Sequence, residues 1–231
     1  MNIIITGGSS GIGKQTALIL SGERSNRILI TGRNKNTLAD VAGKAKHKNI
    51  DYFVTDLQDL HILPGSFRMS VEEVFSPVDI LINNAGLLYA RKFAEIPEEQ
   101  AREMMEVNFF APMIIIRALL PLMNRNSHIV NISSMGGFQG SAKFAGLSYY
   151  SASKAALAVM TECLASEFAE QKISVNCLAL GSAQTEMLEK AFPGYKSPVS
   201  AAEMGKFVAD FALNGNRYFN GKILPVALTT T

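Results

Sequence analysis

The feature that most constrains the fold is an alternation, repeated along the whole chain, of short apolar runs and longer stretches with helical periodicity. Runs rich in β-branched residues predict strands over residues 3–6, 27–31, 50–55, 78–82, 128–132, 173–178 and 222–226. Helical spacing predicts helices over residues 12–21, 35–46, 97–109, 113–124, 149–170, 184–191 and 201–213. Strands that are apolar throughout are typical of parallel sheets with helices on both faces. The sequence therefore predicts a single α/β domain, doubly wound around a seven-stranded parallel sheet.

Composition and charge limit the possible partners. The 231 residues carry 22 Lys and Arg against 20 Asp and Glu, a formal net charge of +2. This balance predicts no nucleic-acid partner and no membrane surface, and no apolar run reaches the ~18 residues of a membrane span. The two cysteines, Cys163 and Cys177, have no spacing that predicts a disulfide framework or a zinc site. The cysteine spacing also leads us to expect no metal. A strand predicted from residue 3 leaves no room for a signal peptide, so we expect a cytoplasmic protein.

A glycine-rich segment joins the first predicted strand to the first predicted helix. It consists of Thr6, Gly7, Gly8, Ser9, Ser10, Gly11, Ile12 and Gly13. A helix N-terminus offers free N–H groups to an anion, and glycines let a pyrophosphate approach the backbone. We therefore predict a Rossmann-like dinucleotide site. The rival P-loop pattern fails because Gln15 stands where a Ser or Thr hydroxyl would bind magnesium.

The end of the second predicted strand bears on the choice between NAD and NADP. A carboxylate here would bind the adenosine ribose hydroxyls of NAD and repel a 2′-phosphate. The residues are Thr31, Gly32 and Arg33, with no carboxylate among them. A guanidinium can bind a phosphate through two charge-assisted hydrogen bonds. Arg33 thus favours NADP(H) over NAD(H), and the alternative reading is a solvated arginine in a glycine turn.

Tyr150 and Lys154 lie four residues apart in a predicted helix, and therefore on one face of it. A free phenol titrates near pH ~10, and a cation within about 4–6 Å lowers the pKa of an acid by about 1–3 units. We therefore expect Lys154 to lower the pKa of Tyr150 and make it a general acid. A second pair with this spacing, Tyr218 and Lys222, contains an Asn-Gly turn signal, so its side chains need not share a face.

Around the first pair the sequence resembles the short-chain dehydrogenase/reductase family, in its compact single-domain branch, over almost the whole chain. The glycine-rich segment is similar to the family's Thr-Gly-x-x-x-Gly-x-Gly cofactor motif, and Tyr150 and Lys154 match its Tyr-x-x-x-Lys motif. Further matches are Asp56, Asn83-Asn84-Ala85-Gly86, Asn108 and Ser133-Ser134. The resemblance implies an oxidoreductase that transfers a hydride between NADP(H) and a ketone or secondary alcohol.

The resemblance also implies roles for single residues. Tyr150 would protonate the carbonyl oxygen, Ser134 would hold that oxygen, and Ser133 is the alternative to Ser134. Lys154 would also bind the nicotinamide ribose, and Asn108 would support a proton-relay water. Donors aimed at the charge that grows on oxygen stabilise the transition state. The expected cofactor-binding residues are Thr6, Gly7, Ser9, Ser10, Gly11, Ile12, Gly13, Arg33, Asp56, Asn83, Ala85, Gly86, Tyr150, Lys154, Gly181 and Thr185.

Two departures from the family pattern affect the loops around the site. Leu180 stands where the family has a proline before Gly181, so we expect the turn to persist with less rigidity. The long spacing from Ser134 to the expected catalytic tyrosine predicts an extended loop over the substrate, residues 136–146. Proline and glycine interrupt the helical periodicity further on and predict a substrate lid near residues 184–200.

We expect a small, largely apolar substrate, with a 3-oxoacyl thioester as an alternative. The reason is that apolar side chains fall in the loops expected around the substrate, namely Met135, Phe138, Phe144, Met187, Leu188 and Phe192. The main alternative function is a sensor or scaffold that binds NADP without turnover. The family resemblance further implies a homodimer or homotetramer.

Overall fold

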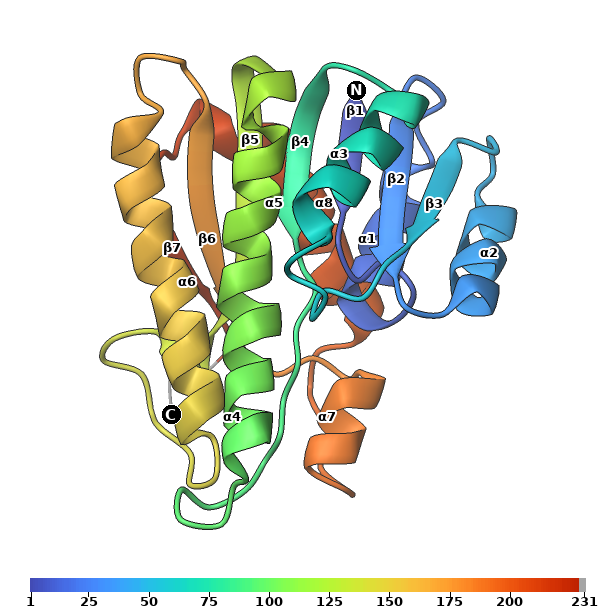
Figure 1. Ribbon diagram of the computed structural model, residues 1–231. Coiled ribbons are helices and arrows are strands. Elements are labelled where there is room, and N and C mark those ends of the chain that lie inside the picture. Colours follow the sequence, from blue (N-terminus) through green and yellow to red (C-terminus); the bar gives the residue numbers. More distant parts are fainter. Residues whose placement is uncertain (229–231) are drawn as a thin grey trace.

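The computed structural model describes residues 1–228, which form a seven-stranded sheet in the order β3-β2-β1-β4-β5-β6-β7 (Figure 1). All neighbouring strands pair in parallel. The strands are β1 (Asn2–Ile5), β2 (Arg27–Gly32), β3 (Ile50–Val54), β4 (Val78–Asn83), β5 (Met123–Ser134), β6 (Ser174–Leu180) and β7 (Ile223–Val226). The predicted doubly wound parallel sheet is confirmed.

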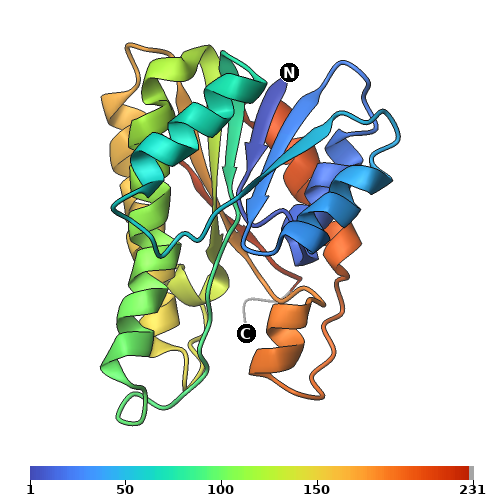
Figure 2. The same ribbon diagram turned by 45° about the vertical axis from the view of Figure 1, so that its right-hand side comes forward.

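Helices cover both faces of the sheet, as Figures 1 and 2 show. They are α1 (Gly11–Leu20), α2 (Lys35–Lys44), α3 (Leu63–Val74), α4 (Glu98–Met105), α5 (Ala111–Leu119), α6 (Ser148–Glu167), α7 (Glu186–Ala191) and α8 (Ala201–Asn214). One buried cluster packs α1, α2 and α8 on the sheet through residues such as Leu20 and Val208. The other packs α3, α5 and α6 on the opposite face, with Phe67 and Ile115 at its centre. The central strands β1, β2, β4 and β6 are therefore covered by apolar side chains on both faces, which explains their continuous apolar sequences, whereas the edge strands β3 and β7 are partly exposed.

Helix α3 was not predicted. Its apolar residues Leu63, Phe67 and Val71 recur every four positions and are all buried. Pro64 and Gly65 near its start resemble loop residues, but a proline in the first helical turn costs no hydrogen bond because the N–H groups there have no helical partner.

The two helices expected over residues 97–109 and 113–124 form one continuous helical run, Glu98–Leu122. A π-helical turn, Glu106–Phe110, joins α4 to α5, and strand β5 begins already at Met123. The run is long and apolar enough to cross a membrane by length and composition, with a mean hydropathy of 1.5 over its most apolar window. Its buried residues, such as Ile115, lie in the core against α3, as expected for a core helix.

The topology places a crevice at one end of the sheet. Strand β1 pairs with β2 on one side and β4 on the other, so the chain leaves β1 in one direction and later returns to pair on its other edge. In open parallel sheets such a switch point leaves a ligand crevice at the carboxyl ends of the strands. These ends lie at the lower side of Figure 1, together with α7.

Candidate active site

A cleft of about 1490 Å³ opens at the carboxyl ends of the strands. The loops after β1, β2, β4, β5 and β6 line it, together with the start of α6. The expected site residues that line it are Gly7, Ser9, Ser10, Gly11, Ile12, Arg33, Asp56, Ala85, Gly86, Ser134, Tyr150, Lys154, Gly181 and Thr185. The sequence motifs therefore come together in one place.

The glycine loop is held in shape by residues behind it. Gly7 has a left-handed backbone (φ +67°), and a Cβ at Gly13 would lie 2.3 Å from the Asn84 Nδ2 atom. Asn84 Nδ2 donates to the Thr6 carbonyl (2.9 Å), and the Asn84 N–H donates to Thr6 Oγ1 (3.1 Å). Thr6 and Gly13 do not line the cleft, so their part in cofactor binding can only be to shape the loop.

Asn83 does not line the cleft, so its contact with a cofactor stays a prediction. Asn83 is buried, and its Nδ2 donates to Asn131 Oδ1 at 2.8 Å within the sheet. Its neighbour Asn84 lines the cleft instead. The side chains of successive strand residues point to opposite sides of the sheet, so the side chains of Asn83 and Asn84 point in different directions.

At the end of β2 the cleft can hold a charged and hydrogen-bonding group. The Thr31 hydroxyl lies at this end, is fully buried, and has no hydrogen-bond partner among residues 1–228. Arg33 is exposed, and no carboxylate within the described part of the chain pairs with it. Asp56 Oδ1 accepts a hydrogen bond from the Gln58 N–H (3.1 Å). An unpaired buried hydroxyl, an unpaired guanidinium and a glycine cradle fit a phosphorylated dinucleotide.

Both Ser133 and Ser134 line the cleft, but their hydroxyls have different partners. The Ser133 hydroxyl is buried and donates to the Lys154 carbonyl at 2.8 Å. Ser134 lines the cleft and forms a hydrogen bond with the Tyr150 hydroxyl. Its Oγ also accepts from the Gly136 N–H at 3.2 Å, which orients it.

Burial controls the protonation of Tyr150 and Lys154. It raises the pKa of the Tyr150 phenol, and the hydrogen bond with Ser134 opposes this rise. Burial lowers the pKa of Lys154 to about 8, and Cys177, whose own pKa is raised by burial to about 11, opposes this shift. The Lys154 ammonium donates to the Ile132 carbonyl (2.8 Å) and is not among the groups that shift the Tyr150 pKa. The expectation that Lys154 lowers this pKa is therefore contradicted, because desolvation is the larger effect.

Asn108 lies in the π-helical turn and does not line the cleft. Its Oδ1 accepts from the Leu87 N–H (2.8 Å), and its Nδ2 donates to the Leu87 carbonyl (2.9 Å) and to Ser153 Oγ (2.9 Å). A Cβ at Gly86 would lie 3.3 Å from Lys154 Nζ and 3.4 Å from Asn108 Oδ1. The Asn108 oxygen and the Lys154 ammonium thus both lie close to Gly86, and the sequence contained no signal for the bond between Asn108 and Ser153.

The turn after β6 persists without the family's proline. The Gly181 N–H donates to the Val226 carbonyl (2.9 Å), and a Cβ at Gly181 would lie 2.8 Å from the Ala227 Cβ, which requires glycine here. Thr185 Oγ1 accepts from the Leu188 N–H (3.2 Å) and caps α7. Backbone packing against the end of β7 therefore holds this turn.

Apolar side chains surround the mouth of the cleft. Five of the six expected residues line it, namely Met135, Phe144, Met187, Leu188 and Phe192, whereas Phe138 does not. Tyr195 and Ser182, which we did not predict, add hydroxyls 3.3 Å apart. Closure of residues 184–200 as a lid stays a prediction. The second Tyr-x-x-x-Lys pair does not line the cleft, and its Tyr218 is 79% exposed.

Comparison with known proteins agrees with this geometry. The family model for short chain dehydrogenases matches residues 1–196. The chain belongs to this family. It is 33% identical over 196 residues to dehydrogenase/reductase SDR family member 7B of Mus musculus, a match that covers 80% of this chain and 58% of the mouse protein. The chain thus matches little more than half the length of that relative.

Two solved structures have the same fold. A dehydrogenase/reductase from Sinorhizobium meliloti 1021 superposes with a TM-score of 0.85 at 27% identity, covering 97% of this chain and 92% of that one. A short-chain dehydrogenase from Burkholderia cenocepacia J2315, in complex with NADP, superposes with a TM-score of 0.83 at 25% identity, covering 97% and 95%. This short-chain dehydrogenase is accordingly an oxidoreductase.

Proposed function

We propose that this short-chain dehydrogenase interconverts a ketone and a secondary alcohol, prefers NADP(H) to NAD(H), and uses Tyr150 as its general acid and base. The observation that carries the proposal is the meeting of Ser134, Tyr150 and Lys154 in one cleft with the glycine loop. These groups come from β5, from α6 and from the segment between β1 and α1. A fold that only held a dinucleotide would have no need of them together.

The cofactor assignment rests on the residues at the end of β2. The N–H groups of the glycine loop would hold the pyrophosphate, and Arg33 would bind the 2′-phosphate of NADP. The Burkholderia neighbour contains NADP in its solved complex, which supports this choice. The cleft of about 1490 Å³ exceeds the ~300–1,000 Å³ of a site for one small molecule, so there is room for a second one. When bound, the cofactor supplies or accepts the hydride.

The protein's own residues handle the proton. Because burial raises the Tyr150 pKa, its phenol is protonated at neutral pH and can donate a proton to the substrate oxygen. Ser134, hydrogen-bonded to Tyr150, is placed to hold the same oxygen. Lys154 follows Tyr150 by one helical turn and lines the same cleft, where it would bind the nicotinamide ribose. Alcohol oxidation uses the same groups in reverse.

The cleft favours an uncharged, apolar substrate. Around Ser134 and Tyr150 it is lined by Met135, Phe144 and Leu188, and such walls desolvate the reacting oxygen and strengthen the hydrogen bonds to it. A small ketone and a 3-oxoacyl thioester both fit this description. Cytoplasmic location and a homodimeric or homotetrameric assembly stay predictions.

A screen of the purified protein tests the proposal. Ketones, quinones and 3-oxoacyl thioesters are offered with NADPH, and its consumption is followed by absorbance. We expect turnover that Tyr150→Phe abolishes, while this variant still binds NADPH, because the change removes one hydroxyl and keeps the ring. If the unaltered protein binds NADPH but reduces none of these compounds, the function is that of a non-catalytic NADP sensor or scaffold.

A further inference from the structure

Ser153 lies between the two residues of the Tyr-x-x-x-Lys motif and is fully buried. Its hydroxyl donates to the Tyr150 carbonyl at 2.7 Å, an ordinary bond for a serine within a helix. It also accepts a hydrogen bond from Asn108 Nδ2 at 2.9 Å, across 45 positions of the sequence. This second bond links the catalytic helix to the π-helical turn.

The bond to Ser153 completes the hydrogen bonding of the Asn108 amide nitrogen. One of its two protons goes to the Leu87 carbonyl, and Ser153 takes the other. The amide oxygen accepts from the Leu87 N–H, so the orientation of the amide is determined. In this orientation the Asn108 oxygen and the Lys154 ammonium both lie within 3.4 Å of the position that a Cβ of Gly86 would occupy.

We propose that Ser153 is a positioning residue, which holds the Asn108 side chain so that its oxygen faces the Lys154 ammonium. The negative end of an amide dipole favours the charged form of a neighbouring lysine. Without the serine hydroxyl, one amide proton of Asn108 loses its buried partner and the side chain gains freedom to turn. The charged form of Lys154 then loses part of its support against desolvation.

The surroundings of Lys154 make this effect measurable. Cys177 of β6 is a titratable group beside it, and burial raises the Cys177 pKa to about 11, so its thiol is neutral where Lys154 titrates. Tyr150, one turn earlier on α6, is the other titratable group, and burial raises its pKa as well. The other elements packed around Lys154 present groups that do not titrate in the relevant range: the Ile132 carbonyl and Ser133 from β5, Gly86 from the loop after β4, and Asn108 itself. Few other charges can therefore obscure the effect of the Asn108 amide on the Lys154 pKa.

Titration of Lys154 by nuclear magnetic resonance tests the proposal without a substrate. The full-length protein is labelled with ¹³C at the lysine Cε carbons, and Lys154→Arg identifies the signal. We expect Ser153→Ala to lower the pKa of Lys154 by about half a unit or more, and Ser153→Thr, which keeps the hydroxyl, to restore the value of the unaltered protein. Ser153→Cys, whose thiol is a weak acceptor, is expected to lie between, and it replaces the alanine variant if that variant does not fold.

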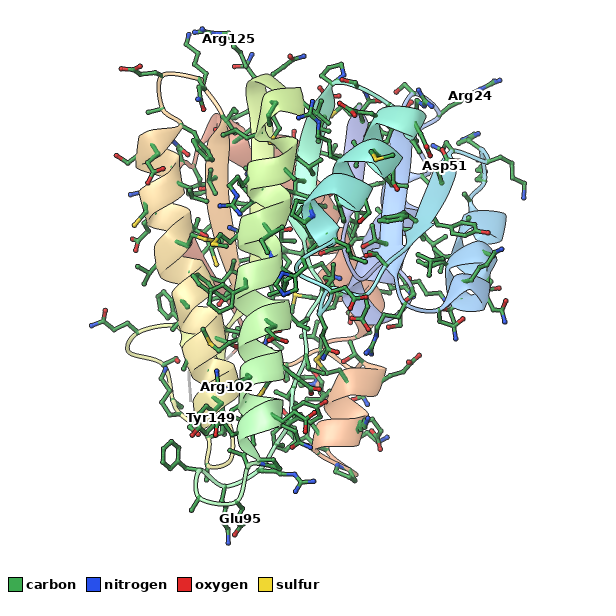
Figure 3. All side chains as sticks on the ribbon, viewed as in Figure 1. Arg24, Asp51, Glu95, Arg102, Arg125 and Tyr149 are labelled. Carbon is green, nitrogen blue, oxygen red and sulfur yellow. The ribbon has the colours of Figure 1, made fainter. Side chains whose placement is uncertain are left out.

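Ser127→Ala is the matched control. Ser127 is also a buried serine with one donated and one accepted bond, to the Val78 carbonyl (2.8 Å) and from the Asn124 N–H (3.0 Å). It lies two residues after Arg125, which Figure 3 shows at the opposite end of the molecule from Tyr149. We expect this variant to lose stability and to leave the Lys154 pKa unchanged. An unchanged Lys154 pKa in the Ser153 variants, or an equal shift in Ser127→Ala, would overturn the positioning role.

The link to turnover rests on the proposed function. If a carbonyl substrate is found, the alkaline limb of kcat/KM for its reduction should move to lower pH in Ser153→Ala by the same amount as the Lys154 pKa. A shifted Lys154 pKa in a protein that reduces no carbonyl compound would refute the proposed function and leave the positioning role intact. A shifted pKa with an unmoved pH profile would refute the part of Ser153 in proton transfer.

Discussion

The buried His128 of β5 makes folding stability depend on pH. Its Nδ1–H donates to the Ala212 carbonyl (2.9 Å), and its Nε2 therefore accepts from Asn176 Nδ2 (3.1 Å). If the ring carried a second proton, the His128 Nε2–H and the Asn176 Nδ2–H would both be donors, and the hydrogen bond between them would be lost. Asn176 cannot offer its oxygen instead, since Oδ1 accepts from the Lys222 N–H (3.1 Å) and Nδ2 also donates to the Phe219 carbonyl (2.9 Å). The folded protein thus holds His128 neutral.

The magnitude follows from the pKa of His128 in the two states. Burial lowers this pKa from 6.5 to about 4 in the folded protein, whereas in the unfolded chain it stays near ~6.5. At about 1.4 kcal/mol per unit, the contribution is about 3 kcal/mol. The unfolded chain takes up the proton first, so this stability is complete above pH 6.5 and is lost as the pH falls from 6.5 to about 4. Domains are typically stable by only ~5–15 kcal/mol, so the loss is large.

Urea unfolding at several pH values measures this effect. Other groups also titrate in this range, so the informative quantity is the difference between the unaltered protein and His128→Gln. Between pH 7 and 4 the free energy of unfolding should fall by about 3 kcal/mol more in the unaltered protein. His61→Gln, at an exposed position, should follow the unaltered protein. Parallel curves for His128→Gln and the unaltered protein would refute the reasoning.

Three further changes test the cofactor and catalytic assignments. Arg33→Ala should weaken NADPH binding about tenfold or more and leave NADH binding nearly unchanged, as measured by fluorescence titration, and equal losses would contradict the NADP preference. Lys154→Met should lower kcat by about 10²-fold or more, while the control Lys222→Met leaves it near normal. Equal losses of kcat in the two variants would contradict the choice of Tyr150 and Lys154 over Tyr218 and Lys222. Gly13→Ala should weaken NADPH binding and lower the melting temperature, because its Cβ would collide with the Asn84 side chain at 2.3 Å, and unchanged values would show that the loop can give way.

The fold could be predicted from local patterns to a large extent. Seven predicted runs became the strands of one parallel sheet, and the central ones are covered on both faces. The errors in the predicted helices arose at prolines, because a proline can stand either at the start of a helix or after its end. Pro64 lies in the first turn of α3, where the missing N–H costs nothing, whereas Pro112 follows the π-helical turn inside the continuous run Glu98–Leu122. A pattern alone does not distinguish a proline that starts a helix from one that ends it.

The pKa of Tyr150 could not be predicted because it depends on the whole fold. The motif places a cation one helical turn away, which argues for a lowered pKa. Burial of the phenol acts in the opposite direction and is the larger effect in the structure. The same burial lowers the pKa of Lys154 to about 8, so the pair meets with both groups shifted toward their neutral forms. The Tyr-x-x-x-Lys spacing thus predicted that Tyr150 and Lys154 lie in one site, and desolvation determined the direction in which each pKa is shifted.

Two pairs of identical neighbours show where a motif reaches its limit. Asn83-Asn84 and Ser133-Ser134 each end a strand, where adjacent side chains point to opposite sides of the sheet. In both pairs the first residue is buried: Asn83 bonds to Asn131, and Ser133 bonds to the Lys154 carbonyl. Asn84 lines the cleft and Asn83 does not, whereas Ser133 and Ser134 both line it and the Ser134 hydroxyl is the one that bonds to Tyr150. Identical residues carry no pattern of polarity that could show which one faces inward, so only the register of the strands assigns the cleft position. Strands β4 and β5 pair with Asn83 opposite Asn131, and this register puts the two side chains in hydrogen-bonding contact and keeps Asn83 within the sheet.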